Sequence, residues 1–147
     1  MQQREARDRN VRRIEYIIRH EKQIAEAVRE ARLSVFGQPE IPGGGSAISK
    51  PTEAMAIRLA DELQEVVVDG RPVEQPERWL KVISAVREWC GQDVIRAEIF
   101  KRRYSGEGYI RTCYDLHIVQ QTYSVFLRDI RDFAIKCACQ MQLIKVF

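Results

Sequence analysis

The chain has 147 residues, of which 45% are hydrophobic and 31% are charged, and its formal net charge is +3. This composition indicates a globular protein and excludes a disordered or collagen-like chain. The length suits one domain with an extension and allows a sizeable core. A net charge of +3 permits nucleic-acid binding through a local patch but does not by itself predict it.

The hydropathy of the chain argues against a membrane protein. No apolar stretch reaches the roughly 18 residues that a membrane-spanning helix requires. The start of the chain is charged from Arg4 onward and lacks the apolar centre of a signal peptide. We therefore expect a cytoplasmic protein with no membrane partner.

Residues 1–36 are predicted to form one long N-terminal helix. The segment 4–36 contains no Gly or Pro, and apolar residues recur in it at spacings of three, four or seven: Val11, Ile14, Ile18, Ala25, Val28 and Val35. A helix of about 30 residues is roughly 45 Å long at about 1.5 Å per residue. It either extends from the body and pairs with another copy in a homo-oligomer, or folds back along its own core.

Residues 37–50 are predicted to be a linker, because Pro39, Pro42 and three successive glycines from Gly43 do not sustain a helix. No Gly-Lys-Ser/Thr follows the glycines, so this is not a phosphate-binding loop. A helix should begin near residues 49–51, where Ser49 can cap it and Pro51 is tolerated in the first turn. Its core face carries Ala54, Ile57, Leu59 and Leu63.

Residues 51–92 form the middle region, with a β-hairpin expected near residues 65–74. Three valines, Val66 to Val68, precede Asp69-Gly70, and Asp-Gly readily supplies the positive φ angles of a tight turn. Pro76 then opens a helix that runs to Cys90. Its broad apolar face is attributed to core packing and carries Trp79, Leu80, Ile83, Val86 and Trp89.

Residues 93–147 have the length pattern of a helix-turn-helix region. A helix ends on a basic cluster near residue 104, a short helix spans residues 109–116, a turn covers residues 117–119, and a long amphipathic helix starts at Gln120. His117 is expected in the left-handed conformation. Val119 cannot supply the N-cap oxygen that usually opens a helix.

The packing of this bihelical unit follows from the same register. Cys113 is predicted at the close crossing of the two helices, where a small side chain is needed. The apolar face that holds the helices together is predicted from Leu116, Ile118, Tyr123 and Phe126.

A set of short motifs extends over roughly residues 43–146. Near the C-terminal end they are Arg103-Tyr104, Tyr109, Leu116-x-Ile118 and Thr122-Tyr123; upstream they are Gly43-Gly44-Gly45, Pro51-Thr52-Glu53 and the eight residues from Pro76 to Ile83. This pattern resembles RinA/ArpU-like phage transcriptional regulators. The resemblance implies a sigma-factor-like C-terminal helix-turn-helix and control of late phage genes, including packaging genes.

The predicted fold is thus all-α with one small β-hairpin, and the predicted partner is double-stranded DNA. At the start of the last helix, Gln120, Gln121 and Ser124 are candidates for base contacts, because Gln can make paired hydrogen bonds to adenine. Candidates for phosphate contacts are Lys101, Arg102, Arg103, Arg111 and Arg128. Two alternatives stay open: a small terminase-like DNA-packaging recognition protein, and an adaptor that binds RNA polymerase.

The sequence contains no recognisable catalytic or metal-binding motif. It has no nucleophile elbow, no His-Glu-x-x-His and no carboxylates spaced to hold a metal. Its cysteines are interpreted as buried reduced thiols, because the two histidines, His20 and His117, lie far from any paired-cysteine spacing: Cys90, Cys113, Cys137 and Cys139. We expect neither an enzyme nor a cofactor.

Overall fold

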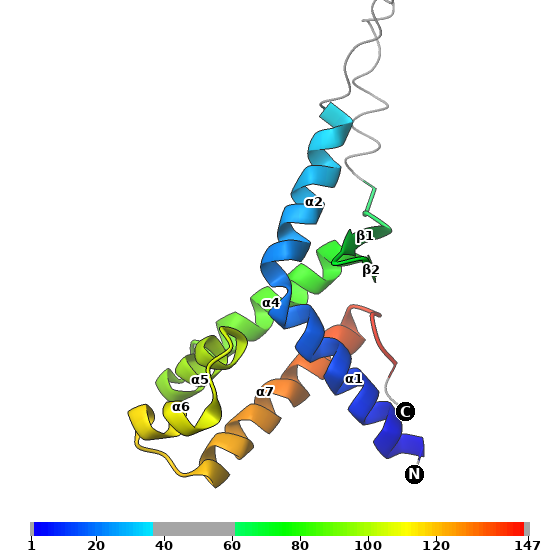
Figure 1. Ribbon diagram of the computed structural model, residues 1–147. Helices are drawn as coiled ribbons and strands as arrows, with labels where there is room; N and C mark the ends of the chain where they lie inside the picture. The colour runs from blue at the N-terminus through cyan, green and yellow to red at the C-terminus, as the bar shows by residue number, and fades with distance from the viewer. Residues whose placement is uncertain (1, 37–60, 146–147) are drawn as a thin grey trace, which may run out of the picture. The chain divides into compact units, whose positions relative to one another are not determined.

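The computed structural model describes residues 2–36 and 61–145 of the chain (Figure 1). Its helices are α1 (Gln2–Arg19), α2 (Glu21–Phe36), α4 (Pro76–Cys90), α5 (Val94–Tyr104), α6 (Tyr109–Leu116) and α7 (Gln120–Gln140). The strands β1 (Glu65–Val68) and β2 (Arg71–Glu74) form one antiparallel pair. The prediction of an all-α fold with one small hairpin is confirmed. None of the described helices is both long and apolar enough to cross a bilayer.

The chain divides into two compact units. The first unit contains residues 1–21 and 78–147, and the second contains residues 22–77. Helix α1, most of α4, and helices α5 to α7 therefore belong to one body. Helix α2 and the hairpin belong to the other.

The prediction of a single N-terminal helix is wrong, because the helix is interrupted at His20, between the end of α1 and the start of α2. The His20 imidazole Nδ1 lies 2.8 Å from the Tyr16 carbonyl oxygen, and the backbone N–H of His20 donates to the same oxygen at 3.1 Å. The imidazole also stacks on the Tyr16 ring, with 4.1 Å between centroids. His20 thus closes the last turn of α1 with its own side chain, a recognised role of histidine at helix C-termini.

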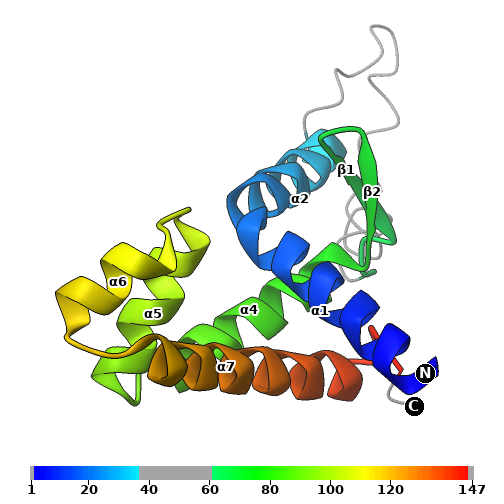
Figure 2. The same cartoon turned by 60° about the horizontal axis from the view of Figure 1, so that its bottom comes forward.

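Helix α1 packs into the core of the first unit. Ile14, Ile17 and Ile18 are buried, and α1 crosses the C-terminal part of α7 (Figures 1 and 2). Of the two interpretations of the N-terminal segment, this arrangement supports the one in which the helix lies along its own core. The apolar side chains of α1 are used within the chain and do not form a free pairing surface.

The rest of this core comes from three helices whose apolar residues recur at helical spacing. On α7 the buried positions advance by three or four residues: Tyr123, Leu127, Ile130, Ala134 and Ala138. Helix α5 buries Ile99 and Phe100. The predicted face of α4 is confirmed for Trp79, Ile83 and Val86, while Leu80 is half-buried. Half-buried Trp89 stacks on Phe133 of α7, with 4.4 Å between ring centroids.

The second unit contains the predicted hairpin. Val66 pairs with Val73, and Val68 pairs with Arg71, so Val66, Val68 and Val73 face inward while Val67 is exposed. The turn is made by Asp69 and Gly70, whose φ angles are 50° and 74°, as an Asp-Gly turn requires. The helix expected to begin near residues 49–51, with Ala54, Ile57 and Leu59, lies outside the described residues, as does the linker. Leu63 is described, and it lies in a non-helical segment before β1.

Candidate nucleic-acid interface

Helices α6 and α7 are joined by a three-residue turn with the geometry of a left-handed helix cap. His117 has φ 54° and ψ 43°, as predicted. The backbone N–H of Ile118 donates to the Cys113 carbonyl at 3.1 Å, and that of His117 donates to the Tyr114 carbonyl at 3.3 Å. These bonds satisfy carbonyls at the end of α6 and redirect the chain into α7. The predicted bounds of α6 and the start of α7 are confirmed.

The N-termini of α5, α6 and α7 differ in how they are capped. The Asp93 carboxylate accepts hydrogen bonds from the backbone N–H groups of Ile95 and Arg96, at 2.9 and 3.2 Å, and fixes the start of α5. Asp immediately before an apolar helix is a recognisable cap signal, which the sequence reasoning did not use. Gly108 and Val119 give α6 and α7 no side-chain cap, as expected for Val119. The first N–H groups of α7 are therefore available to an anion.

The interior of the bihelical unit is built around Tyr123 and Thr112. Tyr123 is 4% exposed, and its ring lies 6.2 Å from that of Tyr109. The fully buried small side chain of α6 is Thr112, whereas Cys113 is half-buried, so the role assigned to Cys113 belongs to its neighbour. The Thr112 hydroxyl donates to the Gly108 carbonyl at 3.3 Å, which satisfies its polar atom in the core. The remaining members of the predicted apolar face are half-buried: Leu116, Ile118 and Phe126.

The predicted base-contact residues lie together at the exposed start of α7. Gln120, Gln121 and Ser124 are all exposed, and Gln120 and Ser124 share one side of the helix, one turn apart. Gln121 also borders a shallow hollow lined by Thr122, Val125, Phe126 and Asp129. Val125, which the sequence reasoning missed, is 42% exposed. The surface thus combines amides and a hydroxyl with apolar atoms of the kind that contact thymine methyl groups.

Three of the five predicted phosphate contacts are on the surface. Lys101 is exposed, and the side chains of Arg111 and Arg128 are 80% and 61% exposed. Arg111 lies 3.6 Å from Glu107 and 3.9 Å from Asp115, and Arg128 lies 3.7 Å from Asp129. Solvated pairs at such distances contribute little, so these cations can turn to a phosphate.

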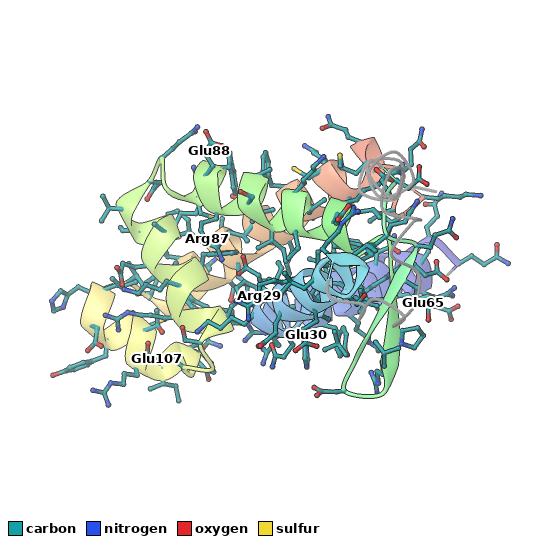
Figure 3. All side chains as sticks on the ribbon, turned by 90° about the horizontal axis from the view of Figure 1, so that it is seen from above. Arg29, Glu30, Glu65, Arg87, Glu88 and Glu107 are labelled. Carbon is teal, nitrogen blue, oxygen red and sulfur yellow. The ribbon has the colours of Figure 1, made fainter. Side chains whose placement is uncertain are left out.

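Arg102 instead holds α5, α6 and the loop between them together. Its guanidinium lies 2.6 Å from Asp115 on α6, 3.2 Å from Glu98 on α5 and 3.5 Å from Glu107 in the loop. Glu107 is labelled beside the α5–α6 loop in Figure 3. The hydrogen bonds to Asp115 and Glu98 raise the pKa of Arg102 above its ordinary value. Because the Arg102 guanidinium already pairs with three carboxylates, it is a poor candidate for a phosphate contact.

Arg103 belongs to a second charge cluster, centred on Glu15 of α1. The Glu15 side chain is 13% exposed, and its carboxylate lies 2.7 Å from Arg131 and 3.7 Å from Arg103. It also accepts a hydrogen bond from the Tyr104 hydroxyl at 3.1 Å, and burial, followed by the negative charge of Glu15, raises the pKa of that phenol. The sequence offers no local signal for this cluster, because Tyr104 and Arg131 lie about one hundred residues from Glu15 in the chain.

Protein-family models, curated proteins and solved structures contain no match to this chain. The function is therefore inferred from the arrangement of α5, α6 and α7 and from the side chains that these helices expose.

The cysteines and acidic residues offer no further site in the described part of the chain. Cys90 is buried, which raises its pKa to about 11 and keeps the thiol protonated near neutral pH. Cys113, Cys137 and Cys139 are half-buried free thiols, and burial raises the pKa of the last two. Within residues 2–36 and 61–145, no three His, Cys, Asp or Glu side chains are grouped to hold a metal ion.

Proposed function

We propose that this chain is a sequence-specific DNA-binding protein that regulates the transcription of phage or prophage genes in the cytoplasm of a bacterial cell. One observation carries the proposal: a short helix, a left-handed turn at His117 and a long helix are packed on a supporting helix, and the start of the long helix exposes polar side chains. This is the arrangement by which helix-turn-helix proteins present a recognition helix. The motifs that resemble RinA/ArpU-like regulators support the phage context.

In this mode of binding the start of α7 enters the major groove. Gln120 and Gln121 then reach base edges, where an amide can both donate and accept hydrogen bonds with adenine. Lys101, near the end of α5, and Arg128, further along α7, are then the exposed cations proposed to contact phosphates. The uncapped N–H groups of α7 add an electropositive helix terminus close to the phosphates.

The direct test is selection of bound fragments from a random library of DNA duplexes with the full chain. Enrichment of a defined sequence is expected, and binding to that sequence should weaken as salt rises. Salt-insensitive binding, or no enrichment, would contradict the proposal and favour an adaptor that binds RNA polymerase. A ring-sized assembly in light scattering would favour a terminase-like packaging protein.

Replacing Lys101 or Arg128 with alanine is expected to weaken binding to all DNA sequences alike. Each lost phosphate contact should reduce the slope of log affinity against log salt by about 1. The matched control is Lys81→Ala, which removes an exposed cation from α4, outside the helix-turn-helix. Fluorescence anisotropy over a salt series measures the slope; equal slopes for Arg128→Ala and Lys81→Ala would exclude Arg128 from the DNA-binding face.

Replacing Gln121 with alanine should affect sequence choice more than overall affinity. We expect a loss of about 1–3 kcal/mol in preference for the selected site over a site changed at one base pair. Gln140→Ala, an exposed glutamine at the far end of α7, serves as the control. Competition with specific and scrambled duplexes measures the difference; full discrimination by Gln121→Ala would show that this side chain reads no base.

A further inference from the structure

Helix α6 carries an uncovered apolar face on the side away from its buried Thr112. Ile110 is 72% exposed and Tyr114 is 80% exposed, and the two lie one helical turn apart. Together with Gly108, Arg111 and Asp115 they line one shallow hollow. In Figures 1 and 2, α6 lies at the edge of the first unit. Two large apolar side chains exposed together indicate an interaction surface.

The charges beside this face identify the kind of partner it fits. Arg111 and Asp115 are one turn apart and lie beside the apolar pair, where Asp115 also pairs with Arg102 at 2.6 Å. DNA would gain little from the apolar pair, because phosphates offer no apolar surface to Ile110 and Tyr114. A surface with one positive and one negative group beside two apolar groups is complementary to itself when turned by 180°.

We infer that this face, formed by Ile110, Arg111, Tyr114 and Asp115, pairs with the same face of a second copy of the chain. In such a twofold contact the two α6 helices are antiparallel, as an isologous interface requires. Ile110 of each copy packs on Tyr114 of the other, and each Arg111 faces the other copy's Asp115. Among the residues that the structure describes, Arg111 pairs with Glu107 and Asp115 at 3.6 and 3.9 Å in solvated contacts, which it can exchange for a better-shielded pair.

The length of α6 sets the strength of this pairing. Eight residues span about 12 Å, so the contact buries much less than the roughly 800 Å² per partner of a stable interface. Association in free solution is therefore weak, with a dissociation constant on the order of 0.1–1 mM. If the proposed DNA binding holds, adjacent sites bring two copies to an effective concentration in the millimolar range, where this contact makes binding cooperative.

The test is sedimentation equilibrium of the full chain without DNA, at concentrations from about 10 µM to about 1 mM, which bracket that constant. The average mass of the wild type should rise with concentration. Tyr114→Glu, which places a charge on the apolar face, should weaken association at least tenfold. Val94→Glu is the control, because Val94 is 82% exposed on α5 and does not line the hollow; it should associate like the wild type.

Arg111 provides a second and independent variant. Arg111→Glu turns two attractive contacts into two repulsive ones and should also weaken association at least tenfold, whereas Arg111→Lys keeps the charge and should retain it. Thermal melting verifies that each variant is folded. A wild type that stays monomeric, or variants Tyr114→Glu and Arg111→Glu that associate like the wild type, would overturn the inference. Because no DNA is present, its failure is distinguishable from failure of the proposed DNA binding.

Discussion

Replacing Tyr123 with alanine is expected to lower the free energy of unfolding by about 3–5 kcal/mol, as removal of other buried aromatic side chains does. Tyr123 is 4% exposed and lies where α6 packs on α7, so truncation leaves a cavity at the centre of the bihelical unit. Urea denaturation followed by circular dichroism measures the loss. Ser124→Ala, at the next and exposed position, is the matched control and should change stability by less than about 0.5 kcal/mol.

Tyr123→Phe separates the contribution of the ring from that of the hydroxyl. The hydroxyl is buried and has no hydrogen-bond partner among the described residues. Removing it therefore leaves no partner unsatisfied, and stability should stay equal or rise by about 1 kcal/mol. A large loss in Tyr123→Phe would show that the hydroxyl makes a hydrogen bond in the folded chain. A Tyr123→Ala variant that melts like the wild type would place this side chain on the surface and reverse the inward and outward sides of α7.

Replacing Glu15 with alanine should cost about 3 kcal/mol of stability. Removal of one partner from a buried ion pair typically costs about 3–5 kcal/mol. The lower end applies because the Arg131 and Arg103 side chains remain 28% and 27% exposed, and water screens part of their charge. Glu5→Ala, an exposed acid on the same helix, is the control. Equal denaturation midpoints for Glu15→Ala and Glu5→Ala would show that the cluster contributes nothing to stability.

Glu15→Gln tests whether charge or shape matters in this cluster. The amide oxygen can still accept from Tyr104 and Arg131, but the negative charge is lost. An intermediate loss of stability is expected, since hydrogen bonds to charged groups are stronger than those to neutral ones. Retention of full stability would mean that the negative charge of Glu15 contributes nothing beyond its hydrogen bonds.

The elements that sequence predicted well are those specified by neighbouring residues. Asp69-Gly70 determines the hairpin turn, Pro76 marks the start of α4, and the amphipathic pattern from Gln120 gives the long helix α7 with Tyr123 facing inward. His117 was identified from the tolerance of histidine for positive φ. In each case the physical cause acts over a few residues and can be read from the sequence.

Some errors arise from local details that apolar periodicity does not resolve, and others from contacts between distant segments. The break at His20 coincides with the contact between the His20 imidazole and the Tyr16 carbonyl oxygen, and the spacing of apolar residues does not reveal this contact. The buried small residue of α6 was predicted at Cys113 but is Thr112, one residue earlier. Adjacent helical residues point about 100° apart, so a shift of one residue changes which side chain faces the core. Arg102 and Glu15 look like ordinary surface charges in the sequence. Folding brings Asp115 to Arg102 and Arg131 to Glu15.

The division of the chain has a consequence for its synthesis. Glu15 and its partner Arg131 are separated by 116 residues, and the whole of the second unit lies between the two segments of the first. Helix α1 leaves the ribosome before α7 and completes its packing only when α7 has been made, on the order of 10 s later at about 5–20 residues per second. During that interval the isoleucines of α1 are exposed to water, and closing so long a loop slows the final docking. The first unit is thus completed after translation has passed its last helix, and a nascent chain that stops before α7 leaves α1 as a target for chaperones.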